Sequence, residues 1–139
     1  MSLRPFHLAI PVDDLNAARH FYGTVLACRI GRESSRWIDF DFFGHQLTVH
    51  LKAHKSEDQA LNEVDQQQVP VPHFGVILDW EPWQQLAESL QQHEVDWIIE
   101  PRVRFQGQVG EQGTLFIRDP AGNALEFKAF QDDAQIFAH

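Results

Sequence analysis

The sequence predicts an α+β fold in which two βαβββ modules surround one cavity. An alternating apolar and polar run, a helical stretch and further alternating runs follow one another in the same order twice along the chain. The runs and the helical stretches each have one apolar face, which suits packing of the helix on the sheet in each half. At 139 residues, the chain is long enough for one domain and too short for two ordinary ones.

The first module is predicted over residues 5–52. Runs that alternate with period two, as half-buried strands do, occupy residues 6–12, 36–42 and 46–51. Asp13 and Asp14 are typical helix-capping residues. Apolar residues then follow at helical spacing, namely Leu15, Ala18, Phe21, Tyr22, Val25 and Leu26. A turn at Gly44 separates the last two strands.

The second module is predicted over residues 71–130 and repeats this order. Its expected strands occupy residues 72–78, 97–99, 114–118 and 124–128. Glu81 and Pro82 begin a helix, since proline is favoured in the first turn. The apolar stripe of that helix consists of Trp83, Leu86, Ala87 and Leu90. Residues 119–123 form a strong hairpin signal between the last two strands.

Two segments are expected to connect these elements. Residues 53–70 are polar and rich in glutamine, which predicts a linker with a short helical turn around Ala60 and Leu61. Residues 100–113 have the composition of a mobile loop. Its turn-forming residues are Pro101, Gly107, Gly110 and Gly113. Such a loop either closes over a cavity or simply joins two strands.

Composition and charge exclude several classes of function. Eleven basic and 20 acidic residues give a net charge of −9, which disfavours nucleic acid and anionic lipid surfaces as partners. No apolar run approaches the roughly 18 residues of a membrane span, and residues 1–7 do not resemble a signal peptide, so a cytoplasmic location is expected. Cys28 is the only cysteine, which excludes an internal disulfide and a cysteine-based zinc cluster.

Strand parity predicts a metal site. His7 shares a strand face with Ala9, opposite the apolar face, and His73 holds the matching position in the second module. Glu126, in the last strand, has the same inward parity. Two imidazoles and one carboxylate that leave neighbouring positions open form the facial triad typical of non-haem iron and related divalent metals. Fe(II) is the first expectation, and Mn(II), Ni(II) and Zn(II) also suit these ligands.

His50 is a further candidate in the first module. Pairing the two repeats without a gap at Gly44 and Gly122 places Thr48, not His50, opposite Glu126. His50 lies on the same face, about 6.6 to 6.8 Å further along the strand. It is therefore a candidate fourth ligand, proton shuttle or polar wall residue.

These residues resemble the vicinal oxygen chelate superfamily, which includes glyoxalase I, extradiol dioxygenases, fosfomycin-resistance transferases and bleomycin-binding proteins. The segments that carry the resemblance are residues 7–15, 18–22, 25–26, 73–76 and 116–127. It implies a U-shaped mixed sheet around one cleft, with His7, His73 and Glu126 as metal ligands. It also implies a homodimer, in some members with exchanged modules, and a small substrate with adjacent oxygens.

The resemblance leaves the reaction open. The segment around Gly44 and His50 looks most like small members grouped with extradiol dioxygenases, which favours a dioxygenase-like oxidoreductase with His50 as the catalytic base. Extradiol enzymes also use a pocket tyrosine, however, and Tyr22 is expected on the outer side of the sheet. The alternatives are a glyoxalase-like lyase or isomerase that uses Glu126 to move a proton, a transferase that neutralises charge with Arg102, Arg104 or Lys128, and a non-catalytic binding protein.

Overall fold

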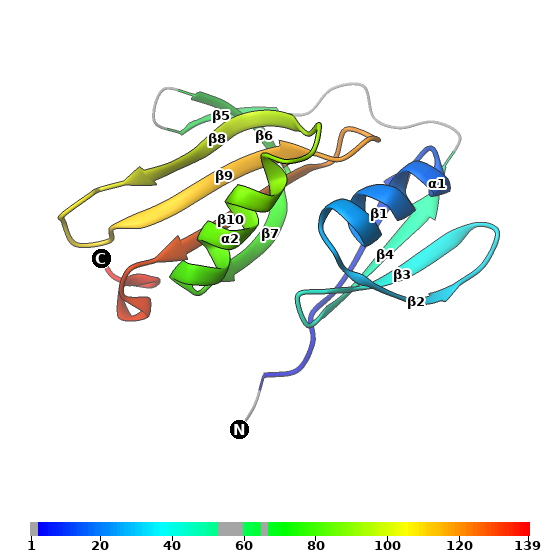
Figure 1. Cartoon of the computed structure of the whole chain (residues 1–139), viewed down its shortest axis with the longest axis horizontal. Coiled ribbons are helices and arrows are strands. Elements are labelled where there is room, and N and C mark those ends of the chain that lie inside the picture. The colour runs from blue at the N-terminus through cyan, green and yellow to red at the C-terminus, as the bar shows by residue number, and fades with distance from the viewer. Residues whose placement is uncertain (1–2, 53–59, 65–66) are drawn as a thin grey trace. The chain divides into compact units, whose positions relative to one another are not determined.

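The computed structural model describes residues 3–52, 60–64 and 67–139 and divides the chain into two compact units (Figure 1). The first unit comprises residues 1–58 and the turn Asp119–Asn123. The second comprises residues 59–118 and 124–139. The two units have the same topology, which confirms the predicted α+β class and the repeated βαβββ order. Among the described residues, no helix is long and apolar enough to cross a membrane.

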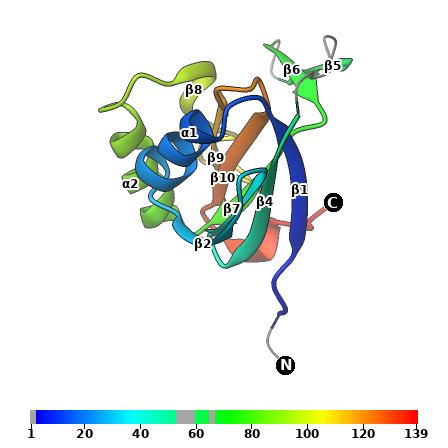
Figure 2. The same cartoon turned by 90° about the vertical axis from the view of Figure 1, so that its right-hand side faces the viewer.

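The first unit is a four-stranded mixed sheet with one helical segment. Its elements are β1 (His7–Val12), α1 (Leu15–Ala18), a π-helical continuation (Arg19–Val25), β2 (Arg29–Glu33), β3 (Trp37–Phe42) and β4 (His45–Leu51). The strand order is β1-β4-β3-β2, in which β1 and β4 run parallel and side by side (Figure 2). Asp14 caps α1 through Ala17 N at 3.0 Å, as the sequence predicts.

The second unit repeats this sheet and adds a hairpin before it. Its elements are β5 (Ala60–Val64), β6 (Gln67–Val71), β7 (Phe74–Leu78), α2 (Trp80–Leu90), β8 (Asp96–Arg104), β9 (Gln112–Arg118), β10 (Ala124–Phe130) and a 3₁₀ turn (Asp133–Gln135). The main sheet has the order β7-β10-β9-β8, with β7 and β10 parallel. The helix α2 lies along β9 and β10 (Figure 1).

One face of each sheet is apolar and packs under its helix. In the first unit, Phe21 and Tyr22 pack edge to face at 4.8 Å, and Tyr22 contacts Phe40 of β3 at 5.4 Å between ring centroids. In the second unit, the Trp83 ring is buried, and its Nε1 donates a 2.9 Å hydrogen bond to Phe127 O. The strand faces that the sequence predicts to be apolar are therefore the faces that form the two cores.

Strand β2 was not among the predicted strands. Its five residues, Arg29–Glu33, contain one large apolar side chain, Ile30, so the period-two signal is weak there. The strand pairs only with β3, and its register shifts between Ile30 and Glu33. Edge strands with bulges need little apolar patterning, which explains the omission.

Two expectations about the connecting segments are wrong. Ala60 and Leu61 belong to strand β5, which pairs with β6, and not to a helical turn; residues 53–59 and 65–66 of the expected linker lie outside the described residues. The loop expected over residues 100–113 is confined to residues 105–111, because β8 and β9 stay paired from Arg102↔Thr114 to Arg104↔Gln112. A register shift between Ile99 and Arg102 accommodates Pro101 within β8.

Candidate metal centre

The structure brings two of the three predicted ligands together in the second unit. His73 Nε2 lies 3.5 Å from Glu126 Oε1, and the two side chains are 28% and 14% exposed. Glu126 is opposite Gly75 in the parallel pairing of β7 with β10, and His73 lies two residues before Gly75, on the same face. The prediction that His73 and Glu126 share one face of the sheet is therefore confirmed.

The close approach of these strands requires glycine at position 75. A Cβ atom built on Gly75 would lie 1.5 Å from Glu126 O and 2.6 Å from its carbonyl carbon, which no larger residue can tolerate. The absence of a side chain there lets β7 and β10 come together beside Glu126. Gly75 thus sets the backbone position of the carboxylate that faces His73.

A carbonyl oxygen orients the imidazole of His73. Its Nδ1 lies 2.8 Å from Pro70 O, and because a carbonyl can only accept a hydrogen bond, Nδ1 bears the proton. In the neutral imidazole, the lone pair of Nε2 is then on the side that faces Glu126. Metal-binding histidines are commonly held in this way, with the second nitrogen donating to a backbone carbonyl. Pro70 belongs to β6, so the hairpin in the predicted linker supplies this contact.

A buried hydroxyl orients the carboxylate of Glu126. Thr114 Oγ1 donates a 2.6 Å hydrogen bond to Glu126 Oε2, which leaves Oε1 directed at His73. The Phe116 ring packs edge-on against His73 at 5.0 Å and belongs to a buried apolar cluster with Val69 and Ile99. These contacts remove most alternative positions of the two side chains.

Pro70, Thr114 and Phe116 are neighbours of the site that the sequence patterns did not predict. Thr114 and Phe116 lie two residues apart on one face of β9. They are opposite Lys128 and Glu126 of β10, respectively. Counting outwards from the predicted hairpin turn at residues 119–123 gives this register, so the sequence contains a signal for both. It contains none for Pro70, because β6 lies in a segment without strand patterning.

The geometry of the His73–Glu126 pair suits two ligands of one metal ion. Ligand atoms about 2.1 Å from a metal and about 109° apart are separated by about 3.4 Å, close to the 3.5 Å between His73 Nε2 and Glu126 Oε1. Neutral imidazole and carboxylate are ligands for iron, manganese, nickel and zinc alike. Over the described parts of the chain, no three His, Cys, Asp or Glu side chains are grouped as a complete metal site.

His7 lies in the first unit, at the start of β1. Its side chain is exposed and shares a face with Ala9, as predicted, and the residue is opposite Gln46 of β4. His73 precedes the first residue of β7 by one position, so the two histidines open corresponding strands. The role of His7 as the third ligand stays a prediction.

His50 and Thr48 occupy the positions that ungapped pairing of the repeats predicts. Thr48 is opposite Ala9, as Glu126 is opposite Gly75, and His50 is opposite Pro11, as Lys128 is opposite Ile77. The first module therefore has a hydroxyl where the second has its carboxylate. His50 is half-buried on the same face, one strand step beyond Thr48.

Tyr22 is not a pocket residue. Its side chain is fully buried under the sheet, and its Oη donates a 2.7 Å hydrogen bond to Asp119 Oδ2. Burial, and then the charge of Asp119, raise the pKa of Tyr22 well above its ordinary value. The sequence predicts that Tyr22, the only tyrosine in the chain, packs on the outer side of the sheet, and its burial between the helical segment and the sheet agrees with that.

Cys28 is a buried thiol. Burial, and then the nearby charge of Asp41, raise the pKa of Cys28 to about 12. Because the thiolate is the reactive form, this side chain behaves as a small apolar group at neutral pH.

Comparison with known proteins places these features in a family. The model of the Glyoxalase/Bleomycin resistance protein/Dioxygenase superfamily matches residues 4–127. A crystal structure of a glyoxalase/bleomycin resistance protein/dioxygenase from Alicyclobacillus acidocaldarius is 33% identical, covers 96% of both chains and has a TM-score of 0.79. No curated protein matches the chain.

Two more distant structures share the fold. The fosfomycin resistance protein FosX from Listeria monocytogenes is 18% identical, with a TM-score of 0.69 over 93% of this chain and 94% of its own. Lactoylglutathione lyase from Agrobacterium tumefaciens is also 18% identical, with a TM-score of 0.63 over 99% and 97%.

Proposed function

Because this chain belongs to the Glyoxalase/Bleomycin resistance protein/Dioxygenase superfamily, we propose that it is a metal-dependent enzyme acting on a small substrate with adjacent oxygens. A divalent ion would be held by His7, His73 and Glu126. The observation that carries this proposal is the His73–Glu126 pair, in which Pro70 O and Thr114 Oγ1 hold the outer atoms and leave Nε2 and Oε1 facing each other. That arrangement is typical of ligands prepared for a metal.

The bound ion would supply Lewis-acid stabilisation of negative charge on a substrate oxygen. The protein's own residues would orient the substrate and move a proton. Glu126 would accept a proton from the substrate, and Thr114 Oγ1 holds its other carboxylate oxygen. His50, on the same sheet face as His7, is a second candidate base, because imidazole can both accept and donate a proton.

Lyase or isomerase chemistry is the reaction that the described residues support best. It needs one carboxylate base, a role that Glu126 would fill. The dioxygenase-like reaction, favoured by sequence resemblance, is the second candidate, supported by the position of His50. It is weakened by Tyr22, whose hydroxyl is committed to Asp119 in the core and cannot serve as the pocket tyrosine of extradiol enzymes.

Metal analysis of protein purified without a nickel affinity step tests the proposal. We expect one divalent ion per chain, and at least about a tenfold lower affinity for that ion in His7→Gln, His73→Gln and Glu126→Gln. His20→Gln, a substitution on the exposed side of the first helical segment, is the matched control and should bind as the wild type does. Unchanged stoichiometry and affinity in the three ligand variants would refute the metal centre and support a binding protein without metal.

Activity with adjacent-oxygen substrates then separates the two reactions. Turnover of methylglyoxal in the presence of a thiol, with nickel or zinc bound, supports the lyase reaction. Oxygen uptake that depends on catechol, with iron bound, supports the dioxygenase reaction and would overturn our preference.

We also propose that the chain forms a homodimer. His7 and the His73–Glu126 pair then belong either to one subunit or to two. Mixing His7→Ala with Glu126→Gln protein distinguishes the cases: only ligands contributed by different subunits allow a mixed dimer to regain one intact metal site. A monomer in sedimentation analysis would refute the dimer.

A further inference from the structure

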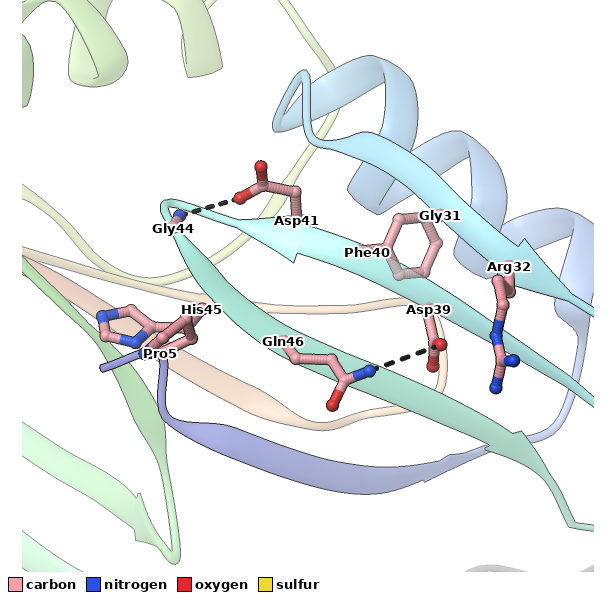
Figure 3. A pocket seen from close by; sticks show the side chains of 9 residues that line it. All are labelled: Pro5, Gly31, Arg32, Asp39, Phe40, Asp41, Gly44, His45 and Gln46. Carbon is pink, nitrogen blue, oxygen red and sulfur yellow. Dashed lines mark hydrogen bonds between the residues drawn. The ribbon is translucent and has the colours of Figure 1, made fainter.

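The sheet face of the first unit that bears His7 also has a pocket of about 380 Å³ (Figure 3). Its polar lining comes from three adjacent strands: His45 and Gln46 of β4, Asp39 and Asp41 of β3, and Arg32 of β2. Figure 3 shows the side chains of Gln46, Asp39 and Arg32 next to one another on the same side of the sheet. One of the lining residues, Gln46, is opposite His7 in the β1–β4 pairing.

Asp39 is a half-buried carboxylate that is held by neutral groups. Thr48 Oγ1 donates to its Oδ1 at 2.6 Å, and Gln46 Nε2 donates to its Oδ2 at 3.5 Å. Of the described residues, no arginine, lysine or histidine nitrogen lies within the 4.0 Å of an ion pair with it. Asp41, which also lines the pocket, differs in that Arg29 pairs with it at 3.3 Å. Asp39 therefore has hydrogen-bond donors but no ion-pair partner among the described residues.

Arg32 places a positive charge at the same pocket. Its guanidinium lies 5.8 Å from the centroid of the Trp37 ring, a stacking contact that orients the group without neutralising it. Its chain neighbour Glu33 points to the other face and pairs with Arg19 of the helical segment. Within the described part of the chain, no carboxylate forms an ion pair with Arg32.

We propose that this pocket binds the ammonium and carboxylate groups of a small zwitterion, such as the α-amino-acid group of a substrate. The ammonium would donate to Asp39, and the carboxylate would accept from Arg32, with Gln46 adding one amide contact. A half-buried charge without a counter-ion favours a ligand that supplies one, and two opposite charges side by side select a ligand with both. The idea that the zwitterion is part of the enzyme's substrate rests on the proposed function. The binding of a zwitterion in this pocket does not depend on that function.

L-alanine is the probe, with ethylammonium and propionate as analogues that keep only one of its charges. The amide signals of ¹⁵N-labelled, metal-free protein are recorded during titration with each compound. We expect L-alanine to shift the signals of Gly31, Asp39 and Gln46, and each analogue to bind at least about tenfold more weakly, since each lacks one charge-assisted hydrogen bond.

Two variants test the assigned contacts. Asp39→Asn keeps the shape of the side chain and should remove the advantage of L-alanine over propionate. Arg32→Gln, at an exposed position, should remove its advantage over ethylammonium. Arg36→Gln and Glu94→Gln, exposed and outside the pocket, are the matched controls and should bind L-alanine as the wild type does.

Equal affinities for the three compounds, shifts confined to other parts of the protein, or unchanged binding in both variants would overturn the proposal. The titration needs neither metal nor turnover. A protein that binds metal but not L-alanine therefore contradicts only the zwitterion pocket. One that binds L-alanine but no metal contradicts only the metal-dependent enzyme.

Discussion

Tyr22 donates a 2.7 Å hydrogen bond from Oη to Asp119 Oδ2, between residues 97 positions apart in the sequence. Asp119 Oδ1 also accepts from the backbone nitrogens of Ala121 and Asn123, at 2.9 and 2.8 Å. The amide of Asn123 donates to Asp119 Oδ2 and to Pro11 O of β1. The β9–β10 turn, Asp119–Asn123, is therefore part of the first unit. The chain re-enters the second unit at Ala124, two residues before Glu126.

Removal of the Tyr22 hydroxyl should destabilise the protein. Tyr22→Phe retains the ring contacts with Phe21 and Phe40 but takes one donor from the buried carboxyl of Asp119. We expect a loss of about 1.5 to 3 kcal/mol in the free energy of unfolding, measured in urea. In the double variant with Asp119→Asn, the losses should be less than additive. A loss below about 0.5 kcal/mol would contradict this role for the hydroxyl.

Asp119 should make stability depend on pH. Burial raises the pKa of Asp119 above its ordinary 3.8, and the hydrogen bonds from Asn123 and Tyr22 oppose this shift without cancelling it. As the pH rises above 3.8, the unfolded chain loses a proton that the folded protein still holds, so this contribution to stability falls until the raised folded-state pKa is passed.

Comparison with Asp119→Asn isolates that contribution, because the variant has no titrating group at this position. The free energy of unfolding of the wild type relative to the variant should be greater at about pH 2.5 than at pH 7, by about 1.4 kcal/mol for each unit by which the pKa is raised. A relative stability that increases with pH would show that the hydrogen bonds outweigh burial.

Gly75→Ala should disrupt both the second sheet and the metal centre. The added methyl group would overlap Glu126 O, forcing β7 and β10 apart at a cost of about 3 kcal/mol in unfolding free energy. Metal affinity should fall as well, since Glu126 moves with its backbone. Gly23→Ala is the control. A Cβ there meets Ile30 at an ordinary 3.6 Å, so the change should be neutral or slightly stabilising. Equal unfolding free energies for the two variants would refute the packing argument.

Thr114→Val should weaken metal binding while preserving the ligands themselves. The variant has nearly the same shape and removes only the donor to Glu126 Oε2. We expect affinity for the divalent ion to fall about tenfold or more, as for other contacts that orient a ligand. Thr24→Val, an exposed substitution, should bind metal as the wild type does in the same calorimetric titration. If the two variants have equal affinities, Thr114 has no orienting role.

The sequence alone predicted the repeated modules, the parity of His7, His73 and Glu126, and the correspondence of Thr48 with Glu126. Strand alternation and ungapped pairing are local rules, and the sheet registers confirm them. The U-shaped arrangement of the two sheets around one cleft and the membership of His7 in the site stay predictions.

Tertiary structure decided which groups surround those residues. Pro70 O reaches His73, Thr114 reaches Glu126, and Tyr22 reaches Asp119 only after strands or helices from separate parts of the chain have packed together. Periodicity determines the face on which a side chain lies, but a hydrogen bond requires two atoms within about 3 Å. That proximity depends on strand order, register and close backbone approaches such as the one at Gly75, which are properties of the folded chain.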